Sequence, residues 1–152
     1  YVNDMLGYLG EKNTEEKAKK IVAFEKEIAK FLLTDEEQDD ITKYNNPMKV
    51  SEIAKKIKNV DIQKFLKDVG VNTDNVNVEE LKYYENLDKI INMSNIEVIK
   101  DYMKFQLISG AAGILDEKTS NRSFEFYGKV LSGRKWRNSW KSLCREEFLG
   151  RS

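Results

Sequence analysis

The chain contains no histidine, and it has a single cysteine and a single proline among its 152 residues. Without an imidazole it cannot form a Ser-His-Asp relay, a Cys-His dyad or a histidine-ligated zinc or haem site. Cys144 alone cannot form an internal disulfide or a Cys-x-x-Cys redox pair, so cysteine content does not indicate the compartment. The sequence therefore predicts no catalytic, cofactor-binding or metal-binding residue in this chain.

Long hydrophobic runs are also missing. The longest apolar runs are only a few residues, whereas a helix that spans a bilayer needs about 20. The first residues have no charged segment followed by an apolar stretch and a small-residue cleavage site, which a signal peptide would have. We therefore expect no membrane segment in this chain. Because it starts at Tyr1 and is amphipathic from there, we expect it to be an internal piece of a longer polypeptide.

Charge is balanced overall but not along the chain. Residues 1–121 hold 18 Lys and 23 Asp or Glu, a net charge of −5, whereas residues 122–152 hold 3 Lys, 5 Arg and 3 Glu, a net charge of +5. A basic end on an acidic body is typical of a patch for nucleic acid or an acidic partner, or of a segment that packs against another domain.

The apolar residues are spaced for helices almost throughout, with 40% hydrophobic and 11% aromatic residues to build a core. The predicted helical segments are 1–9, 14–32, 51–57, 62–69, 81–91, 94–112 and 124–131. Gly10 and Gly70 are expected to end two of them. The only extended segment we expect lies near 76–78. The sequence thus predicts an all-α fold, a bundle-like lobe of several helices, in a single helical domain over residues 1–152.

Two acidic stretches have part of the pattern of a calcium loop. Asp35, Glu37 and Asp39 alternate as the first three ligands would, but the sixth position is Asp40 instead of Gly. In the stretch 68–79, Gly70 stands where a calcium loop has a ligand, and Thr73 stands where it has the turn glycine. We expect both stretches to be solvated turns at helix ends.

The C-terminal segment carries the strongest binding pattern. Its basic and aromatic residues are Arg134, Lys135, Trp136, Arg137, Trp140, Lys141 and Arg145. Guanidinium groups beside aromatic rings suit single-stranded nucleic acid or a membrane surface. The positive charges are few and the body is acidic, so we favour a structural helix whose Trp face is buried and whose basic face meets acidic residues. We expect no nucleic-acid partner; binding that weakens steeply with salt would argue otherwise.

Several short segments form one ordered pattern across essentially the whole chain. They are Tyr1-Val2-Asn3-Asp4-Met5-Leu6, Phe24-Glu25-Lys26-Glu27-Ile28-Ala29, Tyr44-Asn45 with Met48 and Ile53, Val76-Asn77-Val78, Tyr83-Tyr84-Glu85-Asn86-Leu87, Asp101-Tyr102-Met103, and Phe124 to Gly133 followed by Trp136 or Trp140. In order and spacing the pattern resembles the helical region of the neprilysin-like zinc metalloendopeptidases, a family that includes the endothelin-converting enzymes and bacterial oligopeptidases.

This resemblance implies a fold and a role for the chain. Members of the family look like two mostly helical lobes around a large closed cavity. Their catalytic lobe carries a His-Glu-x-x-His helix and a downstream zinc-binding glutamate, and a zinc-bound water attacks the peptide bond there. None of these motifs occurs in this chain. The resemblance therefore implies a fragment of the non-catalytic lobe, which encloses the cavity and restricts entry to peptides.

The same resemblance implies the partners and the cofactor of the parent protein. The partners would be the remaining catalytic lobe of the same polypeptide and peptide substrates, and zinc would belong to the full-length parent. Family members are extracytoplasmic or cytoplasmic, so the compartment stays open. Residues 134–152 depart from the family pattern because they lack its Val-Asn pair, which leaves their register undefined. The alternative function is a stand-alone helical module that binds proteins through this basic, tryptophan-bearing end.

Overall fold

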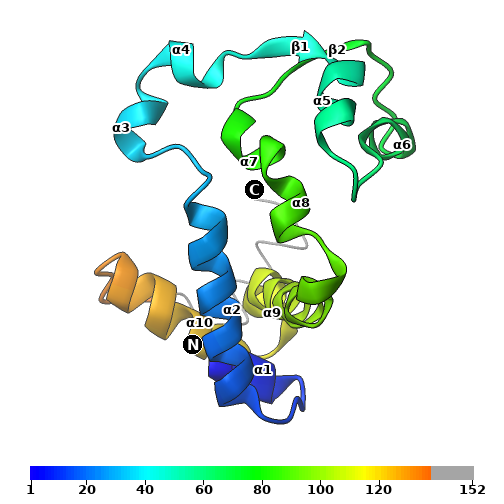
Figure 1. The fold of residues 1–152 in the computed structure, drawn as a ribbon. Helices are drawn as coiled ribbons and strands as arrows, with labels where there is room; N and C mark the ends of the chain where they lie inside the picture. Colours follow the sequence, from blue (N-terminus) through cyan, green and yellow to red (C-terminus); the bar gives the residue numbers. More distant parts are fainter. Residues whose placement is uncertain (138–152) are drawn as a thin grey trace. The chain divides into compact units, whose positions relative to one another are not determined.

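The computed structural model describes residues 1–137. Helices make up most of this part of the chain, and the only strands in it form one small two-stranded sheet (Figure 1). The predicted all-α class is therefore confirmed. The backbone groups into two compact units, which we describe separately. Among the described residues, unit 1 contains 1–21 and 100–137, and unit 2 contains 22–99.

Unit 1 begins with α1 (Val2–Tyr8), which ends where the sequence predicts. Gly10 has φ of 78°, a left-handed conformation that glycine adopts without steric cost. Asn13 precedes α2 (Thr14–Ala29) and is also left-handed, with φ of 54°. Asparagine tolerates this conformation better than most residues, so the two positions reverse the chain between α1 and α2.

The rest of unit 1 consists of most of α9 (Ile96–Leu115), α10 (Glu117–Ser123) and the π-helical η2 (Phe124–Leu131). Asp116 caps α10, because its carboxylate accepts a hydrogen bond from the Thr119 N–H at 2.8 Å. Gly128 lies against the Phe124 ring, and a Cβ there would approach a ring carbon to 2.4 Å. The buried apolar residues of unit 1 are Met5, Leu6, Ile21, Phe105, Ile108 and Ala112.

Unit 2 is a series of short helices around the small sheet. After the end of α2 come α3 (Asp35–Gln38), α4 (Ile41–Tyr44), β1 (Pro47–Lys49), α5 (Val50–Lys56), α6 (Ile62–Asp68), β2 (Asn75–Asn77), α7 (Leu81–Glu85), α8 (Leu87–Ile90) and the 3-10 turn η1 (Met93–Asn95). β1 contacts α5, and α5 packs against α6 (Figure 1). Gly70, with φ of 78°, ends the α6 region as predicted.

The sheet pairs β1 with β2 in antiparallel register, with Met48 opposite Val76. The sequence predicts β2 but not β1. Pro47 follows two asparagines, a pattern that is typical of a loop. Pro47 has no N–H, and the Lys49 N–H donates to the Glu52 carboxylate at 3.0 Å. Neither residue can therefore donate to a further strand, which protects this edge from unwanted pairing.

The core of unit 2 is a cluster of four buried side chains from three segments, Ile53, Ile57, Val78 and Leu87. Next to Leu87, the Asp88 carboxylate accepts hydrogen bonds from the N–H groups of Lys58 and Asn59 at 2.9–3.1 Å. These contacts connect the turn after α5 to α8. Over residues 1–137, no helix is both long enough and apolar enough to cross a lipid bilayer.

Candidate functional site

The acidic stretch after α2 is used for helix capping. Thr34 and Glu37 form a reciprocal capping box at the start of α3, and the Asp40 carboxylate accepts from the Thr42 N–H at 2.9 Å at the start of α4. The hydrogen bond from the Thr34 N–H lowers the pKa of Glu37, and the bonds from Thr42 lower the pKa of Asp40. These carboxylates are thus committed to caps, as expected for solvated turns at helix ends.

The second acidic stretch, residues 68–79, leads into the sheet. Asp68 forms an ion pair with Lys64 one helical turn earlier. The Thr73 hydroxyl accepts from the Asn75 N–H at 3.2 Å, and the Asp74 carbonyl accepts from the Val50 N–H at 2.9 Å. The bond from Val50 holds the start of β2 against the start of α5, and within residues 1–137 no three acidic side chains converge to hold a metal ion.

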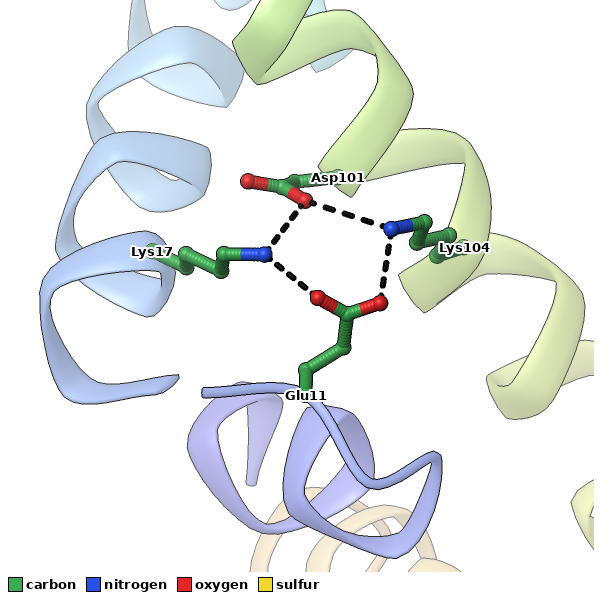
Figure 2. Close-up of polar contacts among 4 residues, drawn as sticks. All are labelled: Glu11, Lys17, Asp101 and Lys104. Atoms are coloured by element: carbon green, nitrogen blue, oxygen red, sulfur yellow. Dashed lines mark hydrogen bonds and ion pairs between the residues drawn. The ribbon is translucent and has the colours of Figure 1, made fainter. Parts of the chain in front are cut away.

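The most connected polar group in unit 1 consists of Glu11, Lys17, Asp101 and Lys104, which we call the ion-pair ring (Figure 2). The Lys17 Nζ lies 2.5 Å from Glu11 Oε2 and 3.0 Å from Asp101 Oδ1. The Lys104 Nζ lies 2.6 Å from Glu11 Oε1 and 3.9 Å from the same Asp101 oxygen. The two carboxylates and two ammonium groups alternate, so every charge has opposite charges as neighbours.

The pKa shifts of Glu11 and Lys17 indicate a structural role for this ring. The hydrogen bonds from Lys104 and Lys17 lower the pKa of Glu11 from 4.5 to about 2, and those to Glu11 and Asp101 raise the pKa of Lys17. A general acid or base needs a pKa close to the working pH, and these shifts go the opposite way. The ring instead joins the α1–α2 turn to α9. The sequence could not reveal it, because about 90 residues separate Glu11 from Asp101.

A second contact group in unit 1 surrounds Tyr1. Its ring stacks on Phe126 with centroids 4.7 Å apart and meets Phe105 edge-on at 5.9 Å. Nearby, Arg122 Nε lies 2.6 Å from Asp4 Oδ2, and this hydrogen bond lowers the pKa of Asp4. Together these contacts tie α1 to α10 and η2. The Tyr1 and Ser109 hydroxyls also share a hydrogen bond of 2.9 Å, and we interpret the role of these contacts as structural.

Unit 2 holds a cavity of about 670 Å³ between the start of α5, α6 and the loop that follows α6. Its lining includes Lys49, Ser51, Gln63, Leu66, Lys67 and Asp74. The volume lies in the range of small-molecule sites. The lining has one carboxylate and two lysines, so it offers no pair of carboxylates for general acid–base catalysis.

Within residues 1–137 the side chains do not fit a zinc site. Catalytic zinc takes three protein ligands, most often histidine with a carboxylate. The sequence has no histidine, and within residues 1–137 no group of three or more cysteine, aspartate or glutamate side chains converges to hold a metal ion. That this chain contributes no catalytic or metal-binding residue remains a prediction.

Only the start of the basic C-terminal pattern falls among the described residues. Trp136 is 88% exposed, and Arg137 Nη1 donates to the buried Ser120 Oγ at 3.1 Å. Trp140, Lys141 and Arg145 lie outside the described residues, as does Cys144. Residues 133–137 are not helical and Trp136 is exposed, so the expected helix with a buried Trp face is wrong for this part of the segment. The register of residues 134–152 against the family pattern stays open.

Comparison with known proteins gives sequence matches along almost the whole chain. Residues 1–148 match the family described as Peptidase family M13. The chain is similar to the neutral endopeptidase of Lactococcus lactis subsp. cremoris, with 31% identity over 69% of this chain. It is also similar to the neutral endopeptidase of Lactobacillus helveticus, with 28% identity over 74% of this chain. In each case the match spans only 17% of the relative's own length.

A solved structure has the same fold. The zinc metalloprotease Zmp1 of Mycobacterium tuberculosis, in an open state, superimposes with a TM-score of 0.84. The superposition covers 98% of this chain and 24% of that protein, at 21% sequence identity. The resemblance seen in the sequence segments, the family match and the shared fold agree along the chain. The chain belongs to peptidase family M13.

Proposed function

We propose that residues 1–152 are a non-catalytic helical region of a zinc-dependent metalloendopeptidase that hydrolyses peptides. The observation that carries this proposal is the family match over residues 1–148. The names of the similar proteins, neutral endopeptidase and zinc metalloprotease, support the reaction and the metal. Because this chain has no histidine, we assign zinc binding and bond cleavage to parts of the polypeptide outside residues 1–152.

Within the whole enzyme, we propose that these residues form one helical domain in the lobe that encloses the substrate cavity. The lobe would restrict access, admitting peptides and excluding folded proteins. A wall with this role must resist deformation, and unit 1 has the contacts for it. The ion-pair ring fixes α9 to the α1–α2 turn, and the Asp4–Arg122 pair fixes α1 to α10. Selection would be steric, with no bond chemistry in this region.

Substrate size tests the steric role. One cleavable sequence is offered to the whole polypeptide as a free peptide and as a surface loop in a stable folded host. We expect cleavage of the free peptide and of the denatured host, but at least about a hundredfold slower cleavage of the folded host, a barrier of about 2.7 kcal/mol or more. The denatured host is the control for sequence context. Equal rates on the folded and denatured host would refute steric selection.

The reading frame beyond Ser152 separates this proposal from the alternative of a stand-alone binding module. A peptidase requires a His-Glu-x-x-His motif several hundred residues further on. A stop codon directly after residue 152 would instead support the module, which would use the exposed Trp136 and the basic residues around it.

A further inference from the structure

One side of α9 is buried within unit 1. Phe105, Ile108 and Ala112 follow one another at i, i+3 and i+7, and each is at most 4% exposed. This spacing places them on a single face of a helix with 3.6 residues per turn. Asp101 lies on the same side, where the ion-pair ring holds it (Figure 2). The rotation of α9 about its own axis is thus fixed by both apolar and ionic contacts.

The opposite side of α9 is also apolar, but it is exposed. Met103, Leu107, Gly110 and Ile114 follow at i, i+4, i+7 and i+11, and we call them the open face of α9. The three side chains are 66%, 75% and 39% exposed, and the face contains no charged residue. A Cβ placed on Gly110 would meet no atom within 4 Å, so a partner has room to approach the backbone there.

A surface helix of a folded domain normally has one apolar face and one polar face. Single exposed apolar side chains are common, but a continuous apolar row along a helix marks a contact surface. An apolar row on each of two opposite faces is typical of a helix that lies between two layers. The described residues supply the layer on the buried side of α9 only.

We propose that the open face of α9 is covered by an apolar helix face from the part of the polypeptide outside residues 1–152. This inference rests on the proposed function, because it requires a longer parent chain. The length of the relatives favours this occupant, since the matched region is only 17% of the neutral endopeptidases. The absence of charge on the open face requires an apolar partner, and Gly110 allows it to pack closely.

Amide hydrogen exchange measures whether the open face is covered. We compare the whole polypeptide with the isolated 152-residue chain, and each with the variants Leu107→Glu and Gln106→Glu. The second variant is a matched control, because it puts the same charge on an exposed position that is already polar, at the edge of the open face. Met103→Gln is a milder variant for use if Leu107→Glu prevents the whole polypeptide from folding.

The inference predicts that amides of residues 103–114 exchange at least about tenfold more slowly in the whole polypeptide than in the isolated chain. Leu107→Glu or Met103→Gln should remove this protection in the whole polypeptide, whereas Gln106→Glu should preserve it. None of the three should change exchange in the isolated chain, where Leu107 is already exposed.

Three results would overturn the inference. Equal exchange in the two proteins would show that the open face stays in water. Protection in the isolated chain that rises with concentration would identify a second copy as the occupant. Protection there that is independent of concentration would place the cover within residues 1–152. Peptide hydrolysis by the whole polypeptide is measured separately, so a loss of the proposed function would not be mistaken for failure of this inference.

Discussion

Truncation of Leu87 tests the core that holds unit 2 together. Leu87 is 4% exposed and packs with Ile53 and Ile57 at α5 and with Val78 after β2. Leu87→Ala removes three buried carbons, which is about 2.4 kcal/mol at about 0.8 kcal/mol per methylene. The cavity that remains adds to this, so we expect the free energy of unfolding to fall by about 3 kcal/mol.

Urea unfolding followed by far-ultraviolet circular dichroism measures this loss. With a slope of about 2 kcal/mol per molar urea, the midpoint should fall by about 1.5 M. Val69→Ala is the matched control, because Val69 is 57% exposed and its truncation should move the midpoint by no more than about 0.25 M. Equal shifts for the two variants would show that Leu87 is not in a packed core, and the account of unit 2 would be wrong.

Two further predictions concern unit 1 and the turn glycines. The folded-state pKa of Glu11 is lowered from 4.5 to about 2, so its contribution to stability is present above pH 4.5 and is lost as the pH falls towards 2. Glu11→Gln should therefore flatten the dependence of the melting temperature on pH in this window, most clearly at low salt; an unchanged dependence would contradict the ring. Gly70→Ala, at φ of 78°, should cost about 1–2 kcal/mol, whereas Gly7→Ala inside α1 should stabilise by about 0.5–1 kcal/mol, because nothing lies within 4 Å of its Cβ. Chemical denaturation of both variants checks this, and shifts of the same sign would refute it.

Features that depend on neighbouring residues were predictable from the sequence. The ends of α1 and of the α6 region follow from Gly10 and Gly70, whose positive φ continues no helix. The helix over residues 124–131 was also predicted, although its π-type winding was not. The helix predicted over residues 94–112 begins later, at Ile96, because a 3-10 turn precedes it and the Asn92 side chain caps that turn by accepting from the Asn95 N–H at 3.1 Å.

Features that depend on distant residues could not be predicted. β1 exists only because Met48 pairs with Val76 across 28 positions of sequence, while its proline argues for a loop. The ion-pair ring joins Glu11 to Lys104. From the sequence alone, every other acidic residue is an equally good candidate for the partner of this lysine. The division into two units has the same cause, because residues 1–21 pack with the chain after residue 100. Local propensity carries no information about such pairings.

Hydrolysis of a short fluorogenic peptide tests the central claim most directly. The whole polypeptide and the isolated 152-residue chain are assayed side by side, each with and without a zinc chelator. The account predicts that the whole polypeptide cleaves the peptide, that the chelator abolishes cleavage and added zinc restores it, and that the isolated chain is inactive in every condition. Cleavage by the isolated chain, or a whole polypeptide that cleaves no peptide, would contradict it.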